Sequence, residues 1–317
     1  MTILVYLEKS SVRGGIEIFA ERHVADLRAA GCEVEVVHDI QRAAFDGFDE
    51  IVVHKCSDVA TLEAFPPEKT VYYVHDHEPI CPRGYAYTPL KRNCTRPGGV
   101  WPCLFCAPLC RSWRAALGRV FSQERRRRAM ARFRKIVVIS EFMKSRLIAN
   151  GIPAEKIAVE PPEIKAGAFG ETRGAGDSGP SGPVDLLYVG QLIRGKGVQL
   201  LLEAMARMKN PRTLDIVGTG NMEPELKALA ARLRLGDRVR FNGFQQNPQE
   251  WMRRASCVVV PSFWQEPYGL VAAEAVALGR RVVAFAIGGL PEACGGKATL
   301  VKAGDVAALA AALDGRS

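Results

Sequence analysis

The sequence has 317 residues, of which 48% are hydrophobic, and it carries a formal net charge of +9. Its length allows about two domains, and its apolar content is enough to give each of them a buried core. A basic chain suits anionic partners, which include nucleotide-sugars, membrane phospholipid and nucleic acid. Because no apolar run is long enough to span a bilayer, we expect no transmembrane segment.

The N-terminus, MTILVYLEKS, lacks the charged region and the long apolar stretch of a signal peptide, and it predicts a first buried strand instead. Without such a signal, the nine cysteines favour reduced thiols or a metal site over disulfides. We therefore expect a cytoplasmic protein.

The N-terminal half has the pattern of a parallel α/β domain. A helical pattern begins at Ile16 and ends at Gly31, and short apolar runs on either side of it predict strands. The predicted strands are Thr2–Leu7, Val34–Val37, Ile51–Val53, Thr70–Val74 and Ile136–Ile139. Ser140 is placed to cap the helix that follows the last of these strands.

Two features of this half lie where a ligand could be met. Gly14 and Gly15, between the first strand and the first helix, permit either the close approach of a ligand or a plain tight turn. Ligands of open α/β sheets collect beyond the carboxyl ends of the strands. His75 and His77 follow a predicted strand directly, so His75 is the first candidate for a ligand contact and His77 the second.

The segment 81–110 is rich in cysteine and has no apolar periodicity. Such a segment has no core of its own and needs a staple. Its pair of cysteines with two residues between them, together with two further cysteines, predicts a structural zinc site at Cys81, Cys94, Cys103 and Cys106. Free thiols are the main alternative, followed by an iron–sulfur cluster or a redox pair. A closed site of four thiolates argues against a catalytic zinc.

The stretch 111–135 is rich in arginine and predicts a helix. One interpretation is a solvated face with an apolar stripe toward the core. The other is a surface that meets an anionic membrane. Nucleic acid is a weaker third partner, because no nucleic-acid-binding motif accompanies the charge.

Glycine, serine and proline dominate between residues 166 and 184, which predicts a flexible linker between an N-terminal domain, 1–165, and a C-terminal domain, 185–317. After this linker the alternation of strands and helices begins again. The predicted strands are Asp185–Val189, Leu214–Val217, Val239–Phe241, Cys257–Val260 and Val282–Phe285, and the predicted helices are Val198–Met208, Glu223–Leu235 and Asp305–Leu313. We expect two Rossmann-like α/β domains.

A glycine-flanked lysine, Lys196, ends the loop GQLIRGKG just before a predicted helix. An ammonium group at that place suits a diphosphate, because the glycines keep the backbone out of the way. The loop is not a Walker motif, since the spacing and the Ser or Thr after the lysine are missing. The alternative is a solvated surface lysine.

The stretch Pro261–Gly279 combines a strand end, a loop with Glu266, a glycine at Gly269 and a helix that carries Glu274. Free N–H groups and the positive end of the helix dipole suit a phosphate at this helix start. Glu274 is then placed to accept from ribose hydroxyls, and Glu266 to reach a second group such as a sugar ring. The alternative is a pair of solvated glutamates that the dipole favours.

The string EPYGLVAAEAVALGRRVVAFAIGGLPE resembles the signature of the retaining glycosyltransferases of family 4. The resemblance is strong from Leu186 to Leu313 and looser from Ile3 to Pro162. It implies the GT-B fold, with two Rossmann-like domains facing each other across a cleft. It also implies transfer of a sugar from a nucleotide-diphospho-sugar to a glycan or lipid-linked acceptor, with retention. No D-x-D motif stands where it could hold a metal on the diphosphate, so we expect no catalytic metal.

The resemblance also assigns roles to single residues. It places His75 near the reacting carbon, Glu266 on the donor sugar and Lys196 on the leaving diphosphate. Family members usually carry Arg where this chain has Gln191, and Arg194 is the residue that could replace its charge. The donor-binding residues that the resemblance implies are Gly15, Gln191, Arg194, Phe244, Gly269, Leu270, Val271 and Glu274. Two other functions stay open, which are a non-catalytic nucleotide-sugar-binding protein and another GT-B enzyme such as a sugar-nucleotide epimerase.

Overall fold

The computed structural model describes residues 1–9, 15–39, 45–82, 84, 86, 93–98, 103, 113–164 and 182–315. The chain divides into two compact units, Met1–Pro162 (unit 1) and Glu163–Ser317 (unit 2). Most of the segment predicted as a linker, 166–184, lies outside the described residues, and so does Gly14.

Unit 1 contains a sheet of six strands in the order β2-β1-β3-β4-β5-β6. All neighbouring strands are parallel. The strands are β1 (Thr2–Leu7), β2 (Glu33–Val37), β3 (Glu50–Lys55), β4 (Thr70–Val74), β5 (Lys135–Val138) and β6 (Ile157–Val159). The central strands are buried on both faces, which explains why they are nearly continuous apolar runs in the sequence.

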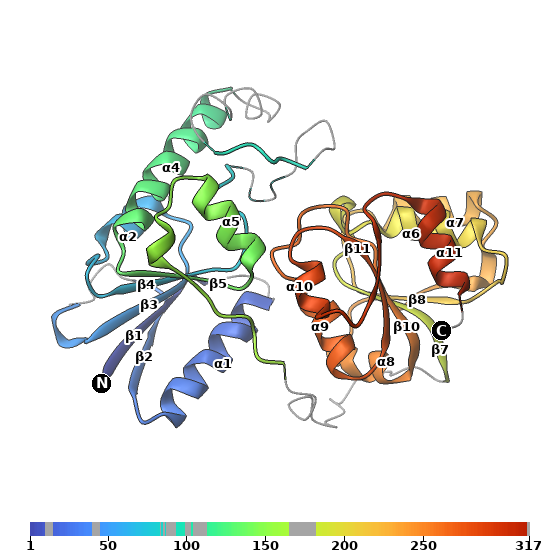
Figure 1. Ribbon diagram of the computed structural model, residues 1–317, viewed down its shortest axis with the longest axis horizontal. Coiled ribbons are helices and arrows are strands. Elements are labelled where there is room, and N and C mark those ends of the chain that lie inside the picture. Colours follow the sequence, from blue (N-terminus) through green and yellow to red (C-terminus); the bar gives the residue numbers. More distant parts are fainter. Residues whose placement is uncertain are drawn as a thin grey trace. The chain divides into compact units, whose positions relative to one another are not determined.

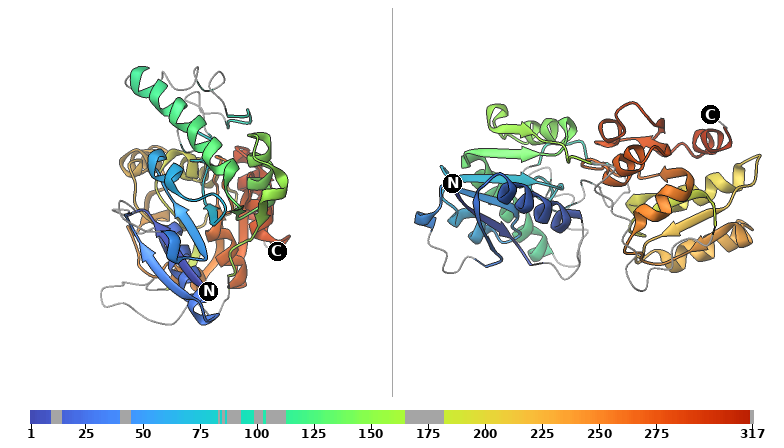
Figure 2. Two further views of the ribbon diagram at one scale, coloured as in Figure 1. Left: turned by 90° about the vertical axis from the view of Figure 1, so that its left-hand side faces the viewer. Right: turned by 90° about the horizontal axis from the view of Figure 1, so that it is seen from below.

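Helices cover both faces of this sheet (Figure 1). Helix α1 (Gly15–Ala29) packs on the face that carries Ile3 and Val5. Helices α2 (Val59–Ala64), α4 (Trp113–Arg132) and α5 (Glu141–Ala149) pack on the face that carries Leu4 and Tyr6. The alternation of side chains along β1 produces these two cores. Figure 2 shows that α4 extends well past the strands of its own sheet.

Unit 2 contains a second parallel sheet of six strands, in the order β12-β11-β10-β7-β8-β9. The strands are β7 (Val184–Val189), β8 (Leu214–Val217), β9 (Val239–Phe241), β10 (Ala255–Val260), β11 (Arg281–Ala286) and β12 (Thr299–Lys302). The first and fourth strands of this unit, β7 and β10, are neighbours, and the chain runs outward from them in both directions. This is the Rossmann order, and its switch point lies between β7 and β10.

The helices of unit 2 also form two layers. Helices α6 (Val198–Arg207), α7 (Glu223–Arg232) and α11 (Val306–Asp314) contribute to one core cluster, while α8 (Pro248–Arg254), α9 (Leu270–Ala277) and α10 (Leu290–Cys294) contribute to the other. Short 3-10 turns occur at Phe45–Gly47, Ala154–Lys156, Arg194–Lys196 and Gly236–Arg238. No helix in the described part of the chain is both long and apolar enough to cross a membrane.

The predicted strands are present, with ends that differ by at most two residues. The predicted helix Glu223–Leu235 is shorter than expected and ends at Arg232. Arg234 lies in the left-handed region, with φ +55°, and this backbone conformation stops the helix. Because arginine seldom adopts such a φ, this helix end could not be predicted from the residue types. The capping role of Ser140 is confirmed, since its side chain accepts from the N–H of Met143 at 3.0 Å.

Candidate active site

The two loops at the switch point of unit 2 lie against each other. One follows β7 and ends at Gly197, and the other follows β10 and begins at Pro261. Gly197 has φ +76°, and a Cβ built on it would lie 1.8 Å from the carbonyl oxygen of Pro261. Only glycine fits this approach, because it tolerates the left-handed conformation and has no side chain to collide. The glycines around Lys196 therefore allow its loop to contact the loop of Glu266.

This approach brings Lys196 and Glu266 into direct contact. The Nζ of Lys196 lies 2.6 Å from Oε1 of Glu266, with side-chain exposures of 24% and 7%. The hydroxyl of Ser262 donates to the same oxygen at 2.7 Å. Nζ also lies 5.1 Å from the ring centroid of Trp264, within the range of a cation–π contact. The lysine is thus held by a carboxylate and an aromatic ring from one loop.

The ion pair keeps the buried carboxylate charged. Burial alone would raise the pKa of Glu266, but the charge of Lys196 and the hydrogen bonds from Lys196 and Ser262 outweigh burial and hold this pKa below its usual value. At neutral pH the site therefore presents one ammonium group beside one carboxylate. Such a pair can serve an anionic ligand group and a hydroxyl-bearing group side by side.

Helix α9 begins beside this pair. Its N-cap, Gly269, has φ +113°, and no side chain of the described residues caps this end. The N–H groups of the first turn, at Leu270 and Val271, therefore point out of the helix start, where an anion is favoured. The loop after β11 closes on the same region, because Gly289 donates to the carbonyl oxygen of Glu266 at 2.8 Å.

The remaining predicted donor-binding residues of unit 2 lie apart from direct contact with the ion pair. Glu274 accepts from the amide of Gln249 at 3.2 Å. Arg194 lies 3.7 Å from Glu225, and both side chains are largely exposed. The main chain of Gln191 accepts from the hydroxyl of Tyr188 at 2.8 Å. The side chain of Phe244 is 71% exposed. Exposed ion pairs are weak, so Arg194 keeps the freedom to turn toward a ligand.

In unit 1, His75 follows β4 as predicted, and it contacts His54, which in turn contacts His23; sequence reasoning had not connected these three histidines. The Nε2 of His75 lies 3.1 Å from Nδ1 of His54, whose Nε2 lies 3.0 Å from Nδ1 of His23. Burial lowers the pKa of His75 to about 3. His77 is buried, and its ring meets the ring of Phe142 edge-on. Gly15 begins α1 and is exposed.

The predicted zinc site lies only partly within the described residues. Cys81, Cys94 and Cys103 belong to the described residues, and Cys106 lies outside them. In the described part of the chain, no group of three or more His, Cys, Asp or Glu side chains is placed to hold a metal ion. The structural zinc therefore stays a prediction.

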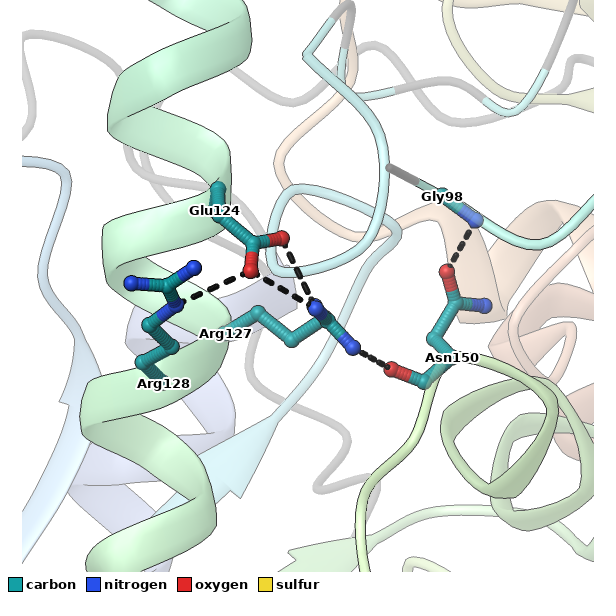
Figure 3. A network of polar contacts seen from close by, with 5 residues as sticks. All are labelled: Gly98, Glu124, Arg127, Arg128 and Asn150. Atoms are coloured by element: carbon teal, nitrogen blue, oxygen red, sulfur yellow. Dashed lines mark hydrogen bonds and ion pairs between the residues drawn. The ribbon is translucent and has the colours of Figure 1, made fainter. Parts of the chain in front are cut away.

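Hydrogen bonds attach residues 93–98 to the end of α5. The guanidinium of Arg146 donates to the carbonyl oxygens of Thr95 and Cys94 at 3.0 and 3.1 Å. Figure 3 shows the neighbouring contact, in which the N–H of Gly98 donates to Oδ1 of Asn150 while Arg127 donates to the main chain of Asn150 at 2.7 Å. The side chains of Arg146 and Asn150, at the end of α5, thus hold this part of the cysteine-rich segment.

The arginines of α4 find acidic partners within unit 1. Arg126 lies 2.9 Å from Glu78, and Arg125 pairs with Glu63. Arg127 and Arg128 share Glu124, at 2.8 and 3.0 Å (Figure 3). The four arginines are therefore paired within unit 1, and Arg126, which is buried, departs from the solvated face of the first interpretation.

Comparison with known proteins finds sequence matches mainly to unit 2. Residues 183–315, which make up most of unit 2, match the family model described as "Glycosyl transferases group 1". The chain is 39% identical over 140 residues to the glycogen synthase of Mycobacterium tuberculosis, covering 42% of this chain and 34% of the relative. It is 35% identical over 174 residues to the D-inositol 3-phosphate glycosyltransferase of Pseudarthrobacter chlorophenolicus, covering 47% and 41%.

The matches span about a third to two fifths of the length of these curated relatives. Solved structures extend the likeness of fold from residues 183–315 to nearly the whole chain. Anabaena Alr3699/HepE in complex with UDP and glucose matches with a TM-score of 0.68 and 20% identity, over 99% of this chain and 89% of that one. WaaG, a glycosyltransferase involved in lipopolysaccharide biosynthesis, matches with a TM-score of 0.63 and 16% identity, over 98% and 89%. The chain has the GT-B fold, as predicted.

Proposed function

We propose that this chain is a retaining glycosyltransferase that moves a sugar from a nucleotide-diphospho-sugar to a glycan or lipid-linked acceptor. The observation that carries the proposal is the contact between Lys196 and Glu266 beside the uncapped start of α9, at the switch point of the sheet. A solved structure of the same fold, Anabaena HepE, holds UDP-glucose. That complex supports a nucleotide-sugar as the donor.

The proposed chemistry is stabilisation of the leaving group. Negative charge builds on the diphosphate as its bond to the sugar breaks, and Lys196 together with the N–H groups after Gly269 lowers the energy of that charge. Glu266 stays ionised and accepts from hydroxyls of the donor sugar. Retention and a metal-free route follow the family resemblance and the missing D-x-D motif, and we propose no metal at the diphosphate.

The test compares two lysines of unit 2 that have matched surroundings. Lys227 lies 2.7 Å from Glu223 and 5.4 Å from the ring centroid of Phe241, much as Lys196 lies by Glu266 and Trp264. Removing one stabilising group from a developing charge costs about 10²–10³ in kcat. We expect that loss for Lys196→Ala and wild-type turnover for Lys227→Ala, measured as nucleotide release from UDP-, GDP- and ADP-glucose.

Other outcomes of this assay would point to the alternatives. Nucleotide binding without turnover on any acceptor would favour a non-catalytic nucleotide-sugar-binding protein. An isomerised donor without an acceptor product would favour a sugar-nucleotide epimerase. Equal turnover of Lys196→Ala and Lys227→Ala would overturn the role of the lysine.

We also propose, as a separate point, that the stretch 111–135 contacts an anionic membrane surface. The arginines of the run Arg125–Arg128 are paired with acidic side chains within unit 1. The support for a membrane contact is therefore the apolar side chain of Phe121, which is 56% exposed, rather than these charges. Sedimentation with phosphatidylserine vesicles tests it, and we expect Phe121→Ser to reduce binding. Equal sedimentation of both proteins would contradict this contact.

A further inference from the structure

Three histidines from three elements form a continuous row in unit 1. Strands β3 and β4 are parallel neighbours with Val53 opposite Tyr72, so His54 lies opposite Tyr73 one residue further along. Side chains alternate along a strand, which places Tyr73 and His75 on the same face of the sheet. Tyr73 belongs to the core cluster on the α1 side, and α1 supplies the third histidine, His23.

The ring nitrogens of the row meet in sequence. Nε2 of His75 lies 3.1 Å from Nδ1 of His54, and the two rings are nearly parallel, at 24°. Nε2 of His54 lies 3.0 Å from Nδ1 of His23. Each contact therefore joins the Nε2 of one ring to the Nδ1 of the next.

The far end of the row reaches a carboxylate. Nε2 of His23 lies 3.4 Å from the hydroxyl of Tyr73, and that hydroxyl lies 3.3 Å from Oε2 of Glu160. The other oxygen of Glu160 lies 2.6 Å from Nζ of Lys135. A carboxylate in an ion pair accepts hydrogen bonds and donates none.

Each ring in the row carries a single proton at neutral pH. Burial lowers the pKa of His54 well below its usual value, with His75 and His23 adding to the effect. Burial also lowers the pKa of His75 to about 3 and lowers the pKa of His23, although the charge of Glu160 opposes the latter shift. A neutral imidazole has one donor and one acceptor nitrogen, so one fixed end determines the direction of every bond in the row.

We infer that Glu160 and Tyr73 fix His75 in the tautomer whose Nε2 is protonated, which makes Nδ1 an acceptor for a hydroxyl of the donor sugar. Burial also raises the pKa of Tyr73, so its hydroxyl keeps the proton that it donates to Glu160. His23 must then donate to the oxygen of Tyr73 through Nε2. His54 donates to His23, and His75 donates to His54.

This direction limits the ligand that His75 can meet. The described contacts of His75 leave its Nδ1 without a protein partner, and the ring of Phe19 packs edge-on against it at 4.9 Å between centroids. An acceptor nitrogen accepts from a hydroxyl and is unfavourable beside a carboxylate, so the ligand group that His75 meets is a hydrogen-bond donor, which in the proposed function is a hydroxyl of the sugar. The identity of the ligand rests on the proposed function, whereas the tautomer does not.

Two-bond ¹H–¹⁵N spectra of the free, histidine-labelled protein at pH 7.5 test the row. We expect a protonated, pyrrole-type shift at Nε2 of His75 and an unprotonated, pyridine-type shift at Nδ1. Tyr73→Phe removes the hydroxyl that directs the row, and Glu160→Gln supplies an amide donor in place of the carboxylate. Both variants should give intermediate shifts at the two nitrogens of His75, from a mixture of tautomers.

Tyr72→Phe is the matched control, because Tyr72 is the neighbouring buried residue on β4 and stacks on Phe133 in the opposite core. It should leave the shifts of His75 unchanged. Protonation at Nδ1 in the wild type, or wild-type shifts in both Tyr73→Phe and Glu160→Gln, would overturn the inference. Adding UDP-, GDP- and ADP-glucose tests the ligand step, and an Nδ1 that none of them perturbs would overturn that step while the tautomer result stands by itself.

Discussion

Gly197 and Gly236 are two glycines of unit 2 with the same backbone constraint and different neighbours. Both have positive φ, +76° and +50°. A Cβ at Gly197 would lie 1.8 Å from the main-chain oxygen of Pro261, whereas a Cβ at Gly236 would have no atom within 4 Å. Their comparison separates the strain of a left-handed residue from the collision of the two loops that carry Lys196 and Glu266.

We predict that Gly236→Ala costs about 1 kcal/mol, which is the usual strain of a left-handed alanine. Gly197→Ala should cost at least about 2 kcal/mol more, because the two loops must move apart, and it should also lower turnover. Urea unfolding of both variants measures the costs. Similar costs for the two variants would show that the approach of the loops is loose.

The histidine row predicts how stability depends on pH. The unfolded histidines bind protons below about pH 6.5, while the folded row resists protonation down to a pKa of about 3 for His75. The unfolded state therefore holds more protons in this window, and stability falls as the pH is lowered. Asp76 has the opposite effect on stability, because burial raises its pKa to about 6 and the folded state then holds the extra proton. This effect is confined to the range between about pH 6 and the usual pKa of 3.8.

Between pH 7.5 and 6, we therefore expect the free energy of unfolding to decrease, with a slope that approaches about 1.4 kcal/mol per pH unit for each histidine below pH 6.5. Urea unfolding at pH 7.5, 6.5 and 6.0 measures the slope. His23→Gln should reduce this slope. His38→Gln, which replaces a histidine outside the row, is the control. A wild-type slope in His23→Gln would contradict the effect of the row.

At the scale of elements, the sequence was informative where a signal lies within one element. The apolar runs of the inner strands and the cap at Ser140 are such signals, and both are confirmed. The short elements β6, β12, α2, α8 and α10 were not predicted. The histidine row was not predicted either, since it depends on which faces of β3, β4 and α1 meet.

The cap of α5 allows a comparison within one helix. Ser140 is buried and accepts from the N–H of Met143, whereas Ser145 is exposed and donates to the carbonyl oxygen of Phe142 at 2.7 Å. We expect Ser140→Ala to cost about 1 kcal/mol or more, because the N–H of Met143 loses its acceptor in a buried place. Ser145→Ala should change the free energy of unfolding by less than about 0.5 kcal/mol. A smaller loss for Ser140→Ala would contradict the cap.

At the scale of the whole molecule, the candidate residues are distributed between two units with separate cores. The family resemblance located Lys196, Glu266 and the start of α9, and the structure brings them together in unit 2. The resemblance did not reveal the ion pair between Lys196 and Glu266, because a contact between two loops depends on strand order. The Rossmann order of unit 2 supplies that information, because it makes β7 and β10 neighbours.

This distribution predicts that nucleotide binding and sugar transfer are separable. A fragment of residues 182–317 contains the complete sheet of unit 2, its two cores and the ion pair. We expect this fragment to fold, to bind a nucleoside diphosphate and to have no transferase activity, because His75 belongs to unit 1. At 100 times its dissociation constant, the nucleotide should stabilise the fragment by about 2.7 kcal/mol, which corresponds to an increase in Tm of roughly 5–15 °C.

Thermal unfolding of the fragment with UDP, GDP and ADP measures this effect. The same fragment with Lys196→Ala should lose most of the shift, because the ammonium group is the side-chain charge that the structure places beside the start of α9. The fragment with Lys227→Ala should keep the shift, since its ion pair with Glu223 lies on α7. If the Lys196→Ala fragment kept the full shift, the diphosphate would be held without this lysine. The proposed stabilisation of the leaving group would then have to rest on the N–H groups of α9 alone.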